Sequence, residues 1–384
     1  MARILAVTWH GGGNVPPMLG IAGELQRRGH KVRVLGHPQQ REAVVSAGLK
    51  FVDYHHGRGW SPKVARFPLR FIFGVFTAPG LGKDVRDEIN REPVDLALVD
   101  SMILSCLHAA EEAGVPTAVL MHTLHRYHTH KWGRGLIGVV AAARGMRPRR
   151  LWAAADRVLV ATDSILDPAT EGRLPANVRY TGVVQAPIQP GTPKDRPLVL
   201  VSLSTLSFEG QQSTLQTILD ALEGLPIGVI VTTGAVAPEA LRVPANVELH
   251  RYIPHDQIMP SVSLIIGHGG HSTTVRALAH GIPLLILPMH RLLDQAMVGK
   301  AVAAAGAGRV LTKTATGEEI RSAVRSLLED PSYRQAAGAA GARLRSRNGA
   351  IAAADELESL LKLDDDSRLS ALSSRFNSDR AMGS

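Results

Sequence analysis

The stretch with the clearest chemical potential is a turn of glycine and histidine at residues 267–270. It follows a short apolar run at 264–266 and precedes a segment with helical spacing. Glycines let the backbone approach a ligand closely, and the first N–H groups of a helix have no partner inside the helix. The turn therefore predicts an anion site, to which Ser272 and Thr273 would add hydroxyl donors.

A polar pair, Asp294 and Gln295, follows a second apolar run at 283–287. A carboxylate and an amide next to each other suit the hydroxyl groups of a sugar, because they offer both acceptors and a donor. A turn whose glycines served only packing would not explain this pair. Phosphate binding beside polyol binding predicts a nucleotide sugar as ligand.

Three motifs occur in a fixed order along this part of the chain: residues 252–255 (YIPH), 268–273 (HGGHST) and 294–295 (DQ). Together they resemble the donor-site signature of nucleotide-sugar-dependent glycosyltransferases of the GT-B fold. The similarity is greatest to bacterial natural-product enzymes related to macrolide, glycopeptide and enediyne glycosyltransferases, and it extends to about residue 360. The resemblance implies an α/β protein with two Rossmann-like, doubly wound domains that face each other across a cleft.

The resemblance also implies an inverting transfer that uses no metal ion and no cofactor besides the nucleotide sugar. Tyr252 and Ile253 would frame the nucleotide base, His268 would donate to a phosphate oxygen, and the Asp-Gln pair would hold the sugar. Small residues at two other strand ends join this set. The donor-binding candidates are Gly12, Gly13, Ser202, Ser204, Thr205, Tyr252, Ile253, His268, Gly269, Gly270, Ser272, Thr273, Asp294 and Gln295.

The catalytic base departs from the family pattern. Many relatives carry a histidine, and some an aspartate, where this chain has Asn14, and an amide cannot accept a proton at neutral pH. We expect His10, at the mouth of the same glycine loop, to be the base and Asp100, at the end of another predicted strand, to orient it. His122 or His125 could replace His10, and His10 could also serve only the loop.

Four of the seven phenylalanines lie within ten residues: Phe67, Phe71, Phe73 and Phe76. They predict either an apolar wall for an acceptor or a helix packed on its own domain, and the variability of this region in related enzymes favours the wall. We take Phe67, Phe71, Phe76, His122 and His125 as acceptor-binding candidates. A metal site among the histidines of 122–130 is disfavoured because no cysteine or carboxylate completes a ligand set.

Alternating strand and helix patterns on both sides of a proline-rich stretch predict two domains, as the length of 384 residues also does. We assign an acceptor-binding domain, a linker with four prolines, a donor-binding domain, a helix crossing back to the first domain, and a disordered tail. Their boundaries are 1–183, 184–197, 198–348, 349–363 and 364–384.

The net charge of +9 lies entirely in the first half, where residues 1–190 hold 24 lysines and arginines against 15 acidic residues. Such a bias suits anionic substrates, a membrane surface or a solvated face. Nucleic acid is disfavoured, since no stacking aromatics are interleaved with the basic residues. The single Cys106 has no disulfide partner, and without a signal-peptide pattern or a long apolar run we expect a cytoplasmic protein, possible as a homodimer.

The function predicted from the sequence is transfer of a sugar or deoxysugar from a dTDP- or UDP-sugar to a hydroxyl, or less readily a carbon, of an apolar small molecule in natural-product (antibiotic) biosynthesis. A lipid-linked acceptor at the membrane face is an alternative, suggested by the basic first half. A nucleotide-sugar 2-epimerase shares the fold, but the phenylalanine cluster argues against it. A non-catalytic auxiliary protein that binds nucleotide sugar also fits a chain with Asn14 in place of the base.

Overall fold

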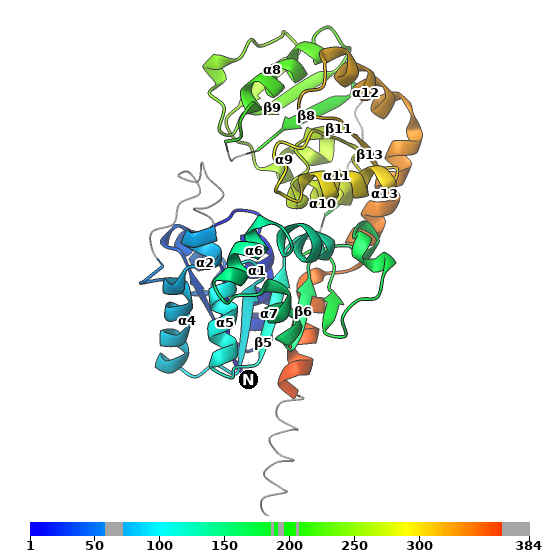
Figure 1. Cartoon of the computed structure of the whole chain (residues 1–384). Coiled ribbons are helices and arrows are strands. Elements are labelled where there is room, and N and C mark those ends of the chain that lie inside the picture. Colours follow the sequence, from blue (N-terminus) through cyan, green and yellow to red (C-terminus); the bar gives the residue numbers. More distant parts are fainter. Residues whose placement is uncertain (58–71, 186–187, 191–195, 205–206, 363–384) are drawn as a thin grey trace, which may run out of the picture.

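The computed structural model of the chain consists of two α/β domains, one above the other in Figure 1, each built on a fully parallel sheet. The residues that the structure describes are 1–57, 72–185, 188–190, 196–204 and 207–362.

The first domain holds a seven-stranded sheet in the order β3-β2-β1-β4-β5-β6-β7. Its strands are β1 (Arg3–Val7), β2 (Lys31–Gly36), β3 (Lys50–Asp53), β4 (Leu96–Asp100), β5 (Thr117–Met121), β6 (Arg157–Val160) and β7 (Val178–Tyr180). Its longer helices are α1 (Val15–Arg27), α2 (Arg41–Ser46), α4 (Pro79–Arg91), α5 (Leu104–Glu112), α6 (Leu136–Ala143) and α7 (Pro148–Ala154). Short helical turns complete it: η1 (Pro38–Gln40), η3 (Ile72–Phe76), η4 (Tyr127–Trp132), η5 (Ser164–Leu166) and η6 (Pro168–Glu171).

The second domain holds a six-stranded sheet in the order β10-β9-β8-β11-β12-β13. Its strands are β8 (Leu198–Ser202), β9 (Gly228–Thr232), β10 (Val247–His250), β11 (Leu264–Gly267), β12 (Leu284–Ile286) and β13 (Gly308–Val310). Its helices are α8 (Gln211–Leu222), α9 (His255–Ile258), α10 (His271–Ala279), α11 (Gln295–Ala304), α12 (Gly317–Glu329) and α13 (Pro331–Ser346), with the turns η7 (Pro238–Ala240) and η8 (Met259–Ser261).

The central strands are largely buried and mainly apolar because helices cover both faces of each sheet. In β4, all five residues are buried, and so are all five of β5. Alternate residues of β1 enter different cores: Leu5 and Val7 join one cluster, while Ile4 and Ala6 join the cluster on the opposite face. Both orders reverse direction beside the strand that opens the domain, which places ligand sites at the carboxyl edges.

The last helix, residues 349–362, lies against the first domain, where it runs down beside β6 in Figure 1. Ala353, Ala354 and Leu357 are fully buried in the core cluster beneath β1 and β2. Arg28 anchors the same helix, since its Nη1 lies 2.7 Å from Asp355 Oδ1 and 2.9 Å from a Glu358 carboxylate oxygen. The chain thus closes on the domain where it began.

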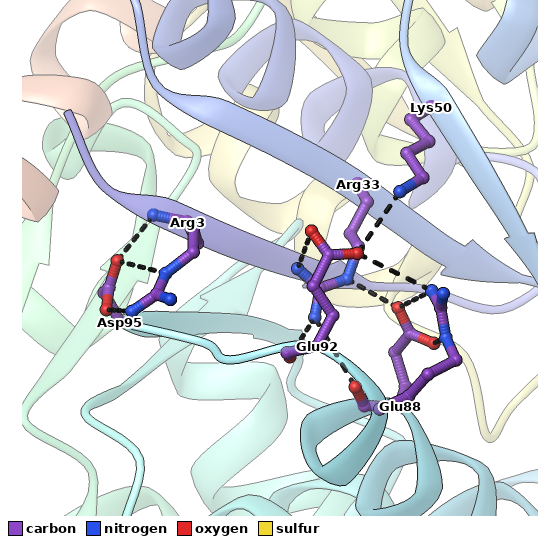
Figure 2. Close-up of polar contacts among 7 residues, drawn as sticks. Arg3, Arg33, Lys50, Glu88, Glu92 and Asp95 are labelled. Atoms are coloured by element: carbon purple, nitrogen blue, oxygen red, sulfur yellow. Dashed lines mark hydrogen bonds and ion pairs between the residues drawn. The ribbon is translucent and has the colours of Figure 1, made fainter.

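An ionic network joins α4 to β2 at the edge of the first sheet, as Figure 2 shows. Arg33 Nε lies 2.5 Å from Glu88 Oε1, and the two residues are only 3% and 5% exposed. Arg91 contacts the same Glu88 carboxylate, and Lys50 pairs with Glu92 at the rim. A buried charge pair of this kind is costly to break, because removal of one partner leaves the other charge unpaired in the core.

The carboxyl edges of the two sheets face each other, because residues in the loops after strands of one sheet contact residues in the loops after strands of the other. Thr123 Oγ1, after β5, donates to Asp294 Oδ2 at 2.6 Å, and His271 Nε2, after β11, lies 2.7 Å from Thr162 Oγ1, after β6. The fold class predicted from the motifs is therefore confirmed. No helix within the described part of the chain is long and apolar enough to cross a membrane.

Candidate active site

The turn between β11 and α10 has the geometry of an anion site. Gly270 is the N-cap of α10, and no side chain caps the helix. The N–H of Thr274 is the first in this stretch to bond within the helix, to Gly270 O, so the preceding amides at 271–273 point outward. With the positive end of the helix dipole behind them, these amides suit a negatively charged group.

Gly269 has to be glycine for two independent reasons. Its φ is +83°, a left-handed conformation that side chains disfavour. A Cβ built on it would lie 2.8 Å from the backbone oxygen of Gln295 and 2.8 Å from Ile286 Cγ2. The turn is thus pressed against the start of α11, which brings the anion site close to the Asp294 loop.

The strand register puts the end of β8 beside the same turn, because Gly267 pairs with Ser202. Ser202 Oγ accepts a hydrogen bond from Thr232 Oγ1 at 2.8 Å, while Ser204 O accepts from Gln211 Nε2 at 3.0 Å. Both serines thus lie at the carboxyl edge with hydroxyls or backbone near the turn. Thr205, predicted with them, lies outside the described residues.

The Asp-Gln pair divides its roles. Asp294 is partly exposed, and burial raises the pKa of its carboxyl group while the Thr123 hydrogen bond opposes the rise. Gln295 is only 2% exposed, and its Oε1 accepts from the backbone N–H groups of Met289 and His290 at 2.8 and 3.0 Å. The Gln295 carboxamide oxygen therefore holds the 288–294 loop together, while the Asp294 carboxylate stays a predicted acceptor for sugar hydroxyls.

Two histidines flank the turn in the neutral form. Burial lowers the pKa of His268 to about 4, and burial together with nearby His122 lowers that of His271 to about 3. The His268 ring folds over Gly270, whose added Cβ would meet His268 Nε2 at 2.6 Å. Each neutral ring keeps one N–H to donate, which suits hydrogen bonding to a phosphate oxygen.

The base-binding candidates lie further along the edge. Tyr252 follows β10, the edge strand of the second sheet, and is 71% exposed, and Ile253 beside it is half-buried. Two strands, β9 and β8, separate β10 from β11. This spacing leaves room between the exposed ring and the anion turn.

The first sheet gathers a different set at its carboxyl edge, because β1, β4 and β5 are neighbours in the order. Asp100 is fully buried at the end of β4, and its Oδ2 accepts a hydrogen bond from Asn14 Nδ2 at 3.2 Å. His122 Nδ1 lies 3.3 Å from the same oxygen. The carboxylate expected to orient His10 is therefore shared by Asn14 and His122 instead.

His10 and the glycines beside it form the loop after β1. The backbone N–H of His10 donates to His37 Nδ1 at 3.2 Å, and partial burial lowers the pKa of the His10 ring. Gly12 has a φ of +97°. A Cβ added to Gly12 or to Gly13 would meet no atom within 4 Å. The loop is therefore open on the side of these two glycines.

The acceptor-side candidates are mostly packed. Phe76 is 5% exposed, with its ring centroid 5.5 Å from Trp9 and 5.2 Å from Trp132, so the packing interpretation fits it better than an open wall. His125 is 7% exposed, and its backbone N–H donates to Asp167 Oδ2 at 2.5 Å. Phe67 and Phe71 lie outside the described residues.

Among the residues that the structure describes, one group could hold a metal ion by spacing, namely His56, Asp84 and Asp87. His56 Nδ1 already lies 2.6 Å from Asp84 Oδ1, and its Nε2 lies 2.9 Å from Lys83 Nζ. An ammonium group at that distance disfavours a second cation, and the remaining ligand, Asp87, is on the surface. The group does not fit a metal site.

Sequence reasoning missed Thr123 and Thr162, the hydroxyls that meet Asp294 and His271 across the two domains. Each follows a strand of the first sheet, and that position was the available signal. It named His122 both as an acceptor contact and as a possible replacement for His10, and in the structure His122 lies beside Asp100.

Comparison with known proteins agrees with this geometry. Residues 216–360 match the family described as Erythromycin biosynthesis protein CIII-like, C-terminal domain. A 4'-demethylrebeccamycin synthase of Lentzea aerocolonigenes is 27% identical, over 94% of this chain and 100% of that protein.

Two solved structures share the whole fold. The glycotransferase of kitacinnamycin superposes with a TM-score of 0.79 at 22% identity, covering 94% of this chain and 99% of that one. The glycosyltransferase VinC in complex with dTDP gives a TM-score of 0.67 at 19% identity, covering 95% and 100%. The chain thus has the GT-B fold and, as its motifs predicted, is a glycosyltransferase similar over most of its length to enzymes of natural-product biosynthesis.

Proposed function

We propose that the chain transfers a sugar from dTDP-sugar or UDP-sugar to a hydroxyl of an apolar small-molecule natural product, with inversion at the anomeric carbon. The observation that carries the proposal is the uncapped N-terminus of α10 behind Gly269, close to Asp294. An anion site beside a carboxylate that can accept hydrogen bonds from sugar hydroxyls matches the diphosphate and the sugar of a nucleotide sugar.

In this proposal the diphosphate binds the amides at 271–273, with the Ser272 and Thr273 hydroxyls and one His268 N–H as further donors. Gly269 and Gly270 permit its close approach, and Ser202 and Ser204 line the other side of the turn, with Thr205 as their neighbour in sequence. Asp294 accepts hydrogen bonds from the sugar, on a loop that Gln295 keeps in shape. Tyr252 and Ile253 border the nucleotide base.

The departing diphosphate gains negative charge as the glycosidic bond breaks. The helix dipole and the aligned amides of α10 offset this charge without reorganisation, which is the usual source of electrostatic stabilisation in transfer reactions. We therefore propose that the nucleotide sugar is the only co-substrate and that no metal ion takes part.

The acceptor binds on the first domain in this proposal, across the facing carboxyl edges. The full-length similarity to a 4'-demethylrebeccamycin synthase supports a small-molecule acceptor over a lipid-linked one. VinC, of the same fold, was solved with dTDP, which supports a thymidine or uridine diphosphate donor. A cytoplasmic location goes with such soluble substrates.

The test is product formation. The intact chain is incubated with dTDP-glucose, UDP-glucose or a deoxysugar analogue and a panel of hydrophobic aromatic and macrocyclic aglycones. We expect nucleotide release together with a product heavier by one sugar unit, in which the anomeric configuration seen by NMR is opposite to that of the donor. His268→Ala should reduce the rate, while His250→Ala, at the end of β10, should not.

Other outcomes favour other functions. Retention of the anomeric configuration would contradict inversion. Conversion of the nucleotide sugar to its epimer without any acceptor would support an epimerase, and transfer only to acceptors embedded in vesicles would support a lipid-linked substrate. Nucleotide binding without turnover of any donor would support an auxiliary protein.

A further inference from the structure

The most unusual arrangement outside the donor turn is the sharing of Asp100 by two side chains. Asp100 Oδ1 accepts from the N–H of Met102 at 2.9 Å, while Oδ2 meets both Asn14 and His122. The carboxylate is fully buried, so its charge is held by protein groups rather than by water. A buried carboxylate beside a histidine ring can hold the ring in the orientation and tautomer that a general base needs.

The geometry points to His122 as the general base of the transfer, with Asp100 as its positioning residue; this inference rests on the proposed function. His122 Nδ1 is buried and lies 3.3 Å from Asp100 Oδ2, a charge contact whose geometry falls short of a hydrogen bond in this structure. Nε2 is the nitrogen that remains, and none of the described residues forms a hydrogen bond with it. The side chain is 14% exposed, enough for one face to meet an acceptor hydroxyl.

The position of His122 relative to the donor side supports the same role. The next residue, Thr123, donates to Asp294 Oδ2 at 2.6 Å, so the backbone that carries His122 touches the sugar-binding loop. His122 also lies near enough to His271, at the start of α10, to act on its ionisation. The ring therefore lies between a buried carboxylate on one sheet and the sugar-binding carboxylate on the other.

The neighbouring groups are worse bases. Asn14 is an amide, and its Nδ2 donates to Trp9 O as well as to Asp100. His128 is fully buried and neither of its ring nitrogens has a partner among the described residues, so an acceptor cannot reach it. His10 lies on the loop after β1, and its backbone is tied to His37. Of the two side chains that meet Asp100 Oδ2, only the half-buried His122 can accept a proton.

The transfer exchanges one bond at the anomeric carbon for another and moves one proton. An acceptor hydroxyl gives its proton to His122 Nε2 while its oxygen forms a bond to the anomeric carbon. The bond from that carbon to the phosphate oxygen breaks, and the electron pair leaves with the nucleoside diphosphate. The Asp100 carboxylate, 3.3 Å from Nδ1, stabilises the positive charge of the imidazolium as it forms, and the proton passes to solvent when the product leaves.

The experiment compares the intact protein with His122→Gln, Asp100→Asn and the double variant, and uses His130→Gln as a control. His130 is an exposed histidine on η4 in the same basic segment. Acceptors are a series of phenols from phenol to 4-nitrophenol, whose hydroxyls are progressively more acidic, with dTDP-glucose or UDP-glucose as donor. Calorimetric binding of dTDP and UDP checks that each variant keeps its donor site.

We expect His122→Gln to lower kcat about 10²- to 10⁴-fold with phenol, the usual effect of losing a general base, with unchanged nucleotide affinity. The loss should shrink as the phenol becomes more acidic, because an ionised acceptor needs no base. Asp100→Asn should lower kcat, and adding it to His122→Gln should cost little more, since it acts through the histidine. The control should match the unaltered chain.

Turnover by His122→Gln close to that of the unaltered chain with phenol would overturn the inference, and so would an equal loss along the whole series with weakened nucleotide binding, which marks a structural role. If the unaltered chain itself releases no nucleotide with any acceptor or with water, the proposed function fails, and the role of His122 fails with it. Failure of the proposed function is thus measured on the unaltered chain, and failure of the His122 role on the His122→Gln variant.

Discussion

The carboxyl edges of the two sheets differ in the kind of chemical group that they present to a ligand. The second sheet offers backbone: a left-handed Gly269, an uncapped helix and small hydroxyls. The first sheet offers side chains: a buried carboxylate, histidines and a cluster of tryptophans packed on Phe76. Backbone amides suit a ligand that every member of an enzyme class shares, whereas side chains can change one at a time. The difference indicates a general donor site facing an adaptable acceptor and catalytic side.

The largest effect should follow a change to the backbone site. Gly269→Val would add a Cβ 2.8 Å from Gln295 O at a φ of +83°, so the turn must shift. Strain of this kind costs about 1–3 kcal/mol, and overlap with fixed backbone adds to it. We expect dTDP and UDP binding to weaken by about 100-fold or more in calorimetric titration.

The control for that change is Gly338→Ala in α13, where an added Cβ meets no atom within 4 Å. It should leave nucleotide binding unchanged and stabilise the helix by about 0.5–1 kcal/mol. Unchanged binding by Gly269→Val would contradict the claim that backbone geometry makes the donor site.

The next effect concerns the stability of the first domain. Glu88→Gln leaves Arg33 buried with only a neutral partner, which should lower the free energy of unfolding by about 3–5 kcal/mol in urea titration. Glu112→Gln breaks an exposed pair with Arg86 and should cost about 1 kcal/mol or less. Equal losses from both variants would show that burial of the Arg33 pair contributes nothing.

A smaller effect is the pH dependence of the free energy of unfolding that arises from two histidines of the second domain. The pKa values of His268 and His271 in the folded chain lie below the ordinary value of 6.5, at about 4 and about 3. Between pH 6.5 and 4 the unfolded chain therefore binds more protons than the folded chain. The free energy of unfolding keeps the full contribution of these histidines above pH 6.5 and decreases as the pH falls below it. The slope should approach about 1.4 kcal/mol per pH unit for each histidine.

Urea unfolding at pH 7.5, 6 and 5 measures this slope, and His271→Gln should remove its own share. The difference between the two chains isolates the histidine from carboxylates that titrate in the same range. A difference that does not vary with pH would mean that His271 is not held in its neutral form by the fold.

The smallest effect should come from the contact between the two edges. Thr123→Val removes the hydroxyl that donates to Asp294, while Thr123→Ser keeps it. A hydrogen bond to a carboxylate orients that carboxylate, so we expect kcat/KM for the donor to fall by about tenfold in the valine variant only. Equal behaviour of the two variants would show that packing, and not the hydroxyl, matters at this point.

The same contrast explains how far the sequence could be interpreted. The fold and the turn at 267–270 were predictable because strand, glycine and helix follow one another locally, and a glycine at a sharp turn has a physical reason. The pairing of Asp100 was not, because it depends on β1, β4 and β5 being neighbours, which no local pattern states. His10 is nearest to Asn14 in sequence, yet His122 is the histidine on Asp100.

Two further differences have the same origin. Gln295 was predicted to hold the sugar, and the structure adds a role that the sequence did not indicate: its oxygen accepts from backbone N–H groups of the 288–294 loop. Phe76 was expected to form an acceptor wall, but Trp9 and Trp132 surround it. In both cases a packing or hydrogen-bonding demand from distant residues decides where the side chain lies.

The division of labour between the two edges is tested most directly by nucleotide titration. Calorimetric binding of UDP, dTDP and GDP is compared for the unaltered chain, His268→Ala and His122→Gln. We predict selective binding of UDP or dTDP, weakened in His268→Ala and unchanged in His122→Gln. Absence of binding, or an equal loss in both variants, would contradict a donor site built on the second sheet and a catalytic base supplied by the first.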